Sequence, residues 1–514
     1  MASSTLLIDG SHLKIKDIQN LARNPGIKVA LTPQAKINVA RSFAFVHKEM
    51  QTKVTYGVNT GFGPMASYIL GHEDLVDLQY NLIRSHAMGM GEPLPNPFVL
   101  ATMIVRLNTL AKGYSGVSIE LLETLQALIN ARIIPIVPEH GSVGTSGDLV
   151  QLAHIGLALI GEGDVVYKGI RMQAHKALQQ AKIRAHTLKP KEGLSLINGT
   201  SCMAGIAALL CGDAETLINR AVQNGVLANE LVFGFSDSTS EVLQAVRPHA
   251  GQVAIAATMR SLLKTSKRQR DRKQFQSKNS IKPHSHVIDE SVQEVYSLRC
   301  IPQILGPVFD TWKQVCKDVE VEINSVTDNP IVDITHKVFL HGGNFHGDYI
   351  AAAMDKLKMV MVKLGLLSER RTNFFLNPNI NHGFPPFMNL KKPGLTLGLQ
   401  GLQFVSTSTA ADNQSLAYPH YLHSISTNGD NQDVVSMGTD CALFCAKVIE
   451  NAFVIVAIET ITLVQGVDVV GAVKTFSKTS QALYKAVRSV HKAIIDDRAI
   501  GQDLARVVAM LKVQ

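Results

Sequence analysis

The chain has 514 residues, of which 46% are hydrophobic and 18% charged, a composition typical of soluble globular proteins and a length that predicts two or more structural units. Its six cysteines are scattered without a CxxC pair, which argues against zinc and disulfide patterns, so we expect no metal. The sequence shows neither an uncharged apolar run of membrane-spanning length nor a secretory signal, so we expect a cytoplasmic protein without a membrane partner.

The net charge of +8 is concentrated in one stretch. Residues 264–278 (KTSKRQRDRKQFQSK) hold seven basic residues and one acidic residue. The stretch lacks interleaved aromatic residues and any DNA-binding motif, so a solvated loop or helix face is expected, with an anion- or nucleic-acid-binding patch as the alternative. We expect no nucleic-acid partner.

The regular elements, taken in chain order, begin with a weak strand signal and continue as helices. Two short apolar runs in DVVYKGIRM (164–172) predict a small hairpin. Apolar residues recur at helical spacing over 309–323 and again over 350–364. The segment 440–466 is long, apolar on most sides and free of proline, as is typical of a helix inside a bundle.

These signals predict a mainly α fold. We expect a long central helical bundle in residues 196–514 and a smaller mixed N-terminal domain in residues 1–195. Glycine lets the backbone turn sharply and approach a ligand, and loops on a rigid scaffold often carry chemistry. The glycine- and proline-rich loops are 56–65, 89–97, 140–148, 197–201, 341–348 and 381–387.

The usual catalytic templates are absent from this sequence. It has no GxxxxGK[ST] loop, no HExxH, no GxSxG and no strand-borne GxGxxG with a following acidic partner. Polar and aromatic residues in or near the glycine-rich loops are the remaining candidates. They are Tyr56, Asn59, Ser85, His86, Ser146, Asn198, Gln293, Tyr296, Arg299, Asn344, Phe345 and Gln432.

The loop around Ser146 allows an unusual chemistry. In a turn flanked by glycines, the backbone nitrogen of Gly147 can approach the carbonyl carbon of Thr145, and two dehydrations then close a five-membered ring. Loss of the Ser146 hydroxyl leaves an electron-poor methylidene carbon that can accept an amine. The ordinary side chains offer nucleophiles, acids and bases, but no comparable electrophile.

The sequence resembles the aromatic amino acid ammonia-lyases and aminomutases along nearly its whole length. The motifs YGVNTGFGPMA, LQYNLIRSHAMG, GSVGTSGDLVQLAHIGLALIGEG, EGLSLINGTS, VQEVYSLRCIPQILGP, NSVTDNPI, GGNFHGDY and NGDNQDVVSMG stand in the family's order. The resemblance implies that Thr145, Ser146 and Gly147 form 4-methylidene-imidazol-5-one. Thr145 departs from the family's usual alanine, but its side chain would lie outside the ring.

The resemblance also implies roles for individual residues. Tyr56 would be the base that removes the β proton of the substrate, which requires a partly ionised phenol. Arg299 would bind the substrate carboxylate through two hydrogen bonds. Positions that hold the electrophile and the amine correspond to Asn198, Gln293 and Tyr296, and Phe345 would pack beside the cofactor.

Two positions bear on the substrate and point in different directions. The pair Ser85-His86 resembles that of histidine ammonia-lyases, whereas Gln432 stands where those enzymes carry a glutamate. A buried histidine could instead bind a phenolic hydroxyl, which favours tyrosine over phenylalanine. We therefore expect deamination of L-tyrosine to p-coumarate and ammonia, with phenylalanine second and histidine third.

Other outcomes stay open at the level of the sequence. An aminomutase would use the same electrophile but return ammonia to the β carbon. A catalytically silent helical scaffold would leave Thr145, Ser146 and Gly147 uncyclised. The resemblance further implies a homotetramer in which each active site draws residues from more than one subunit.

Overall fold

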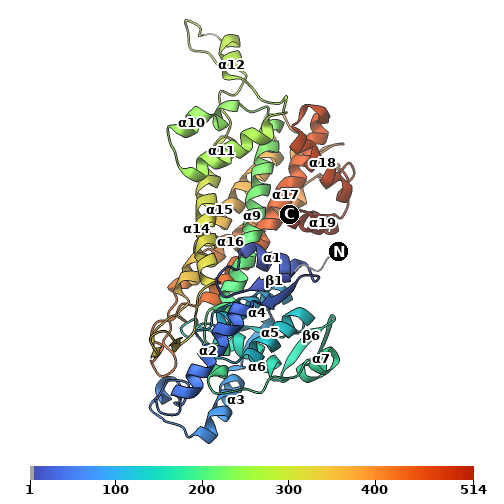
Figure 1. The fold of residues 1–514 in the computed structure, drawn as a ribbon. Coiled ribbons are helices and arrows are strands. Elements are labelled where there is room, and N and C mark those ends of the chain that lie inside the picture. Colours follow the sequence, from blue (N-terminus) through green and yellow to red (C-terminus); the bar gives the residue numbers. More distant parts are fainter. Residues whose placement is uncertain (1–4, 280, 382, 514) are drawn as a thin grey trace. The chain divides into compact units, whose positions relative to one another are not determined.

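A computed structural model describes residues 5–279, 281–381 and 383–513 of the chain (Figure 1). Helices dominate these residues, so the predicted mainly α class is confirmed. The chain forms two compact units. Unit 1 comprises residues 1–212, 315–355 and 419–445, and unit 2 comprises residues 213–314, 356–418 and 446–514. The expected division into continuous domains at residue 195 stays a prediction.

All the strands of the described residues belong to unit 1 and form small sheets. β1 pairs with β2 in parallel, while β3 with β5, β4 with β6, β6 with β7 and β8 with β9 pair antiparallel. Strands β6 and β7 form the hairpin predicted for 164–172. The strands are β1 Thr5–Ile8, β2 Lys28–Leu31, β3 Met90–Pro93, β4 Ile134–Pro135, β5 Pro138–His140, β6 Asp164–Tyr167, β7 Ile170–Gln173, β8 Ile331–Asp333 and β9 Val338–Leu340.

Helix α4 is a buried helix of unit 1 and packs against α1, α2 and α5. Every residue of α4 from Val99 onward is buried, because apolar side chains cover most of its surface. Ser118 caps the start of α5, where its hydroxyl accepts a hydrogen bond from the Leu121 N–H, and Arg132 in the left-handed conformation caps the end. The helices are α1 Ile15–Arg23, α2 Pro33–Glu49, α3 Leu75–His86, α4 Asn96–Ala111, α5 Ile119–Ala131, α6 Leu149–Leu159, α7 Ala174–Ala181 and α8 Glu192–Ile197.

Four long helices contribute residues to both units. They are α9 Ser201–Leu231, α14 Ile301–Glu322, α15 Asp348–Leu376 and α17 Gly438–Val470, and the last three contain or coincide with the predicted helices at 309–323, 350–364 and 440–466. The other helices of unit 2 are α10 Glu241–Ala245, α11 Ala250–Leu263, α12 Arg272–Lys278, α13 Tyr296–Arg299, α16 Gln400–Leu416, α18 Lys478–Val490 and α19 Gly501–Lys512.

Buried polar contacts join these helices inside unit 2. The Arg371 guanidinium of α15 forms a buried ion pair with Glu459 of α17. The amide of Asn224 in α9 donates to the same carboxylate over 3.1 Å. Three helices are therefore connected through one carboxylate, which satisfies charges that would be costly to bury unpaired.

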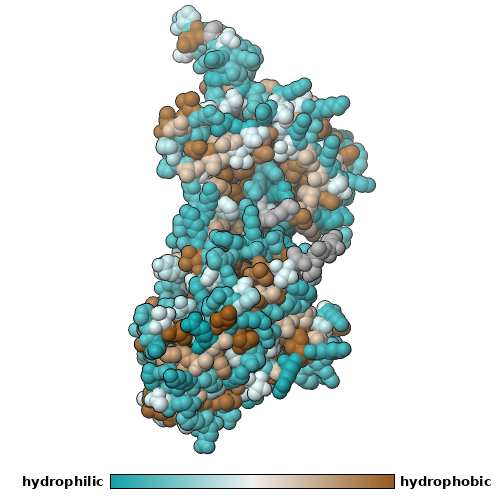
Figure 2. All heavy atoms as spheres, viewed as in Figure 1, coloured by the Kyte–Doolittle hydropathy of each residue, from teal (hydrophilic) through white to brown (hydrophobic). Residues whose placement is uncertain are grey.

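Among the described residues, α9 and α17 have the length and apolar composition of a membrane-crossing helix. Core helices of soluble proteins share this property, and the most apolar windows of α9 and α17 are 89% and 61% buried within the protein. Hydrophilic residues predominate on the face shown in Figure 2, with hydrophobic residues scattered among them.

Candidate active site

The tripeptide Thr145-Ser146-Gly147 lies in the loop between β5 and α6 and is held by backbone hydrogen bonds. The N–H of Gly199 donates to the carbonyl oxygen of Ser146 over 3.2 Å. The N–H of Asp148 donates to the carbonyl oxygen of Gly199 over 2.8 Å. Gly147 has a φ of +71°, and a Cβ on it would lie 2.1 Å from the Gly199 carbonyl. Glycine is therefore required at this position by both conformation and space.

The other end of the loop is held in the same manner. The carbonyl of Gly144 accepts hydrogen bonds from the N–H of Gly347 over 3.0 Å and from the hydroxyl of Ser436 over 3.1 Å. The carbonyl of Val143 accepts from the N–H of Met437 over 2.9 Å. Loops distant in sequence thus hold both sides of the tripeptide.

Asp148 anchors the tripeptide to the first turn of α9. One oxygen of its buried carboxylate accepts from the N–H groups of Cys202 and Met203 over 2.8 and 3.0 Å, and the other accepts from the Thr439 hydroxyl. Burial raises the pKa of Asp148 from 3.8 to about 6, although these hydrogen bonds and the Arg106 charge act to lower it. A carboxylate here also interacts favourably with the helix dipole.

A cavity of about 300 Å³ opens beside the tripeptide. It brings together several residues that the sequence predicts for the site, although their roles stay predictions. The lining residues are Tyr56, Thr145, Ser146, Asn198, Asn329, Phe345, His346, Asn428, Asn431, Gln432, Asp433 and Val434.

Gln432 contacts both side chains at the start of the tripeptide. Its Nε2 donates to the Ser146 hydroxyl over 2.9 Å, and its Oε1 accepts from the Thr145 hydroxyl over 2.7 Å. Thr145 therefore uses the hydroxyl that distinguishes it from alanine to orient this amide. The amide then presents its N–H groups toward Ser146.

Tyr56 places its phenol on the same cavity. Its Oη accepts a hydrogen bond from the N–H of Gly63 over 3.1 Å, and its ring is in edge contact with Phe62 at a centroid distance of 6.3 Å. This hydrogen bond fixes the position of the phenol oxygen.

Asn198 shows unused hydrogen-bonding capacity. The residue is 3% exposed, and its Oδ1 has no hydrogen-bond partner among the described residues. A buried polar atom without a partner is costly, so its presence beside Ser146 indicates that another group binds there. The oxygen is an acceptor, so the group that it suits is a donor such as an amine. The Gly199 N–H at the Ser146 carbonyl oxygen is the contact that fits a cyclised tripeptide.

Ser85 and His86 do not line this cavity. His86 Nδ1 lies 2.9 Å from the Leu82 carbonyl oxygen and 3.1 Å from the Ser85 hydroxyl. The last turn of α3 thus contacts the Ser85 hydroxyl and Nδ1 of His86.

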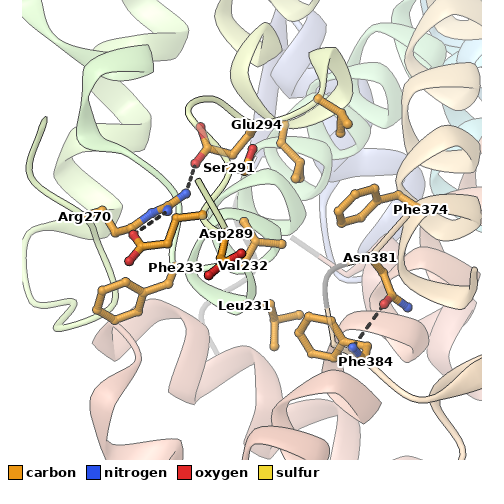
Figure 3. A pocket seen from close by; sticks show the side chains of 13 residues that line it. Leu231, Val232, Phe233, Arg270, Asp289, Ser291, Glu294, Phe374, Asn381 and Phe384 are labelled. Carbon is orange, nitrogen blue, oxygen red and sulfur yellow. Dashed lines mark hydrogen bonds and ion pairs between the residues drawn. The ribbon is translucent and has the colours of Figure 1, made fainter. Parts of the chain in front are cut away.

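Gln293, Tyr296 and Arg299 belong to unit 2, whereas every residue that lines the cavity belongs to unit 1. Tyr296 is 69% exposed, and the Arg299 guanidinium lies 4.6 Å from the centre of its ring. A second cavity of about 250 Å³, lined partly by Glu294, Val295 and Leu298, lies beside this segment (Figure 3).

Several cavity residues were not singled out from the sequence. They are polar, and all lie within motifs that carried the family resemblance. These residues are Asn329 in NSVTDNPI, His346 in GGNFHGDY, and Asn428, Asn431 and Asp433 in NGDNQDVVSMG. No cluster of histidine, cysteine or acidic residues suited to a metal ion is found in the part of the chain that the structure describes.

Comparison with known proteins identifies one family over nearly the whole chain. A family model described as aromatic amino acid lyase matches residues 13–489. A probable histidine ammonia-lyase of Thermoplasma volcanium is 39% identical over 97% of this chain and 97% of its own. A histidine ammonia-lyase of Geobacillus thermodenitrificans is 38% identical over 99% of this chain and 97% of its own. The crystal structure of a tyrosine aminomutase from Streptomyces globisporus has a TM-score of 0.95 and 34% identity, covering 99% of this chain and 97% of that one.

Proposed function

This chain belongs to the aromatic amino acid lyase family and is a carbon–nitrogen lyase, and from that premise we propose that it releases ammonia from an aromatic L-amino acid. The product is an α,β-unsaturated acid. The observation that carries this proposal is the cavity that joins Ser146 to Tyr56, Asn198 and Gln432.

The proposed cofactor is 4-methylidene-imidazol-5-one, built from Thr145, Ser146 and Gly147. The backbone nitrogen of Gly147 bonds to the carbonyl carbon of Thr145 with loss of one water, and the Ser146 hydroxyl leaves as a second. The group supplies an electrophilic carbon for the substrate amine. The Gly199 N–H, 3.2 Å from the Ser146 carbonyl oxygen, would hold that oxygen by a hydrogen bond in the cyclised group.

The residues of this chain supply proton transfer and orientation. Tyr56 takes the β proton of the substrate, assisted by the Gly63 N–H that donates to its oxygen. Asn198 provides the free hydrogen-bonding group beside the tripeptide. Phe345 provides an apolar side chain on the cavity wall, beside which an aromatic substrate ring can pack.

Histidine and tyrosine are the substrates that the observations favour, and phenylalanine stays the alternative. The curated relatives named above are histidine ammonia-lyases, which favours histidine over the tyrosine that sequence motifs place first. The carboxylate of Asp433 on the cavity wall suits an imidazolium. Tyrosine is supported by the neutral amide of Gln432 next to Ser146 and by the structural similarity to a tyrosine aminomutase.

The proposed assembly is a cytoplasmic homotetramer with shared active sites. Large hydrophobic side chains are exposed, among them Tyr296 at 69% and Phe404 at 65%, and burying such residues stabilises subunit contacts. Light scattering tests the mass of the assembly. Mixing Tyr56→Phe subunits with Arg299→Ala subunits should give more turnover than either variant alone if one site uses two copies.

The test of function is turnover by the purified protein with tyrosine, histidine and phenylalanine separately. Each conjugated acid is followed by its ultraviolet absorbance, and NMR of the product separates an unsaturated acid from a β-amino acid. Turnover of none of the three would refute the proposal. An intact mass without the loss of two waters would refute the cofactor and favour the silent scaffold.

A further inference from the structure

The basic stretch 264–278 has no part in the proposed reaction, yet its arginines are engaged in contacts rather than solvated. Arg268 donates from Nε to the Glu230 carbonyl at the end of α9 over 2.8 Å. Its guanidinium also lies 4.8 Å from the centre of the Phe476 ring. The Arg268 guanidinium thus contacts other residues of unit 2 instead of only solvent.

Arg270 binds the segment 289–299, which carries Gln293, Tyr296 and Arg299. Its Nη2 lies 3.0 Å from Glu294 Oε1, and the same oxygen accepts from the Phe235 N–H over 3.0 Å. The Glu294 side chain is only 8% exposed. Figure 3 shows this ion pair at the edge of the second cavity.

Arg272 binds the same segment on the other side of Gln293. Its Nη1 donates to the Val292 carbonyl over 2.6 Å, while its Nε lies 2.7 Å from Asp237 Oδ2. Both guanidiniums lie on the Phe235 ring, at 4.0 Å for Arg270 and 3.5 Å for Arg272. Both arginines therefore pack on the same phenylalanine ring, and each binds one of the two residues adjacent to Gln293 in the chain.

The segment 289–299 has little apolar burial of its own to fix its position. Val292 is 53% exposed, Val295 41% and Tyr296 69%, whereas Leu298 at 1% is its buried anchor. Segments with few buried apolar contacts open easily, so polar contacts contribute much of the stability of their folded conformation.

We propose that Arg270 and Arg272 are positioning residues that clamp Glu294 and Val292 and thereby place Gln293, Tyr296 and Arg299 for the substrate. The planar guanidinium donates in two fixed directions, which a lysine cannot reproduce. This inference rests on the proposed function for its catalytic consequence, but the clamp itself is measurable without turnover.

The experiment combines hydrogen–deuterium exchange of the segment 289–299 with kcat and KM for the best substrate. Its variants are Arg272→Gln, Arg270→Gln and the charge-preserving Arg272→Lys, and the control is Lys273→Gln, which removes the same charge from an exposed neighbour. Each glutamine variant loses a charge-assisted hydrogen bond. The exchange rate of the segment 289–299 and KM should therefore both rise about ten- to hundredfold, while kcat changes less. Arg272→Lys should lie between them and the wild type, and Lys273→Gln should match the wild type.

Unchanged exchange in all the arginine variants would overturn the clamp, and so would equal changes in Lys273→Gln. Faster exchange with an unchanged KM would overturn its role in placing the substrate residues. If Arg272→Gln does not fold, Arg272→Lys decides by the same two measurements. A wild type without turnover would instead refute the proposed function, and exchange alone would then decide whether the clamp exists.

Discussion

The loop at 145–147 and the segment at 289–299 both carry predicted site residues, but they are held by different means. Backbone hydrogen bonds, glycines and the buried Asp148 carboxylate fix the loop, and Thr145 is only 4% exposed. Arginine side chains hold the segment, in which Tyr296 is 69% exposed. A reaction of backbone with backbone needs the rigid arrangement, whereas residues that bind a substrate can be adjusted through side-chain contacts.

Ser146→Ala tests the loop with the largest expected effect. The change removes the hydroxyl that must leave to form the methylidene carbon, so turnover should fall below detection with every aromatic amino acid. Intact mass should not show the loss of two waters, while the melting temperature stays within a few degrees because the backbone contacts remain. Ser489→Ala, on the exposed face of α18, is the control. Normal turnover by the Ser146 variant would contradict the proposed cofactor.

Tyr56→Phe tests whether the cavity holds the base. Loss of general base catalysis typically costs about 10²–10⁴ in rate, and the reduction should appear in kcat. Intact mass should still show the loss of two waters, because Tyr56 has no hydrogen bond to the tripeptide. The exposed Tyr68→Phe is the control. Equal kcat in the two variants would remove Tyr56 from the mechanism.

Asp148→Asn tests how the loop is anchored to α9. Because burial raises the folded pKa of Asp148 to about 6, its contribution to the free energy of unfolding is greatest below about pH 4 and is lost as pH rises through 6. The loss approaches about 3 kcal/mol for a shift of this size. Urea unfolding from pH 4 to 7 should show this decline in the wild type and not in the variant. If the free energy of unfolding changed with pH equally in the two proteins, the titration of Asp148 would not be the cause.

Arg299→Lys tests the exposed segment with the smallest expected effect. A lysine keeps the charge but loses two-point binding of a carboxylate, so KM should rise about tenfold while kcat changes less. Cofactor formation should be complete by mass. Arg41→Lys, an exposed residue of α2, is the control. A loss confined to kcat would indicate that Arg299 acts on chemistry instead of binding.

Much of the fold and part of the site could be predicted from local pattern. The helices at 309–323, 350–364 and 440–466 were predictable because apolar spacing is a local property. The turn around Gly147 was predictable because glycine tolerates a positive φ. The contact between Thr145 and Gln432 was not, because 287 positions separate the two residues.

The sequence by itself determined the helical class, the family and the residues that can form an electrophile, because each depends on residue type at fixed spacing along the chain. Only the tertiary structure decided which of the candidates meet. It placed Tyr56, Ser146, Asn198 and Gln432 on one cavity, and it placed Nδ1 of His86 at the Leu82 carbonyl of its own helix end. It also engaged the arginines of 264–278 in specific contacts. The physical reason is that hydrogen bonds and ion pairs depend on distances in space, which local spacing does not specify.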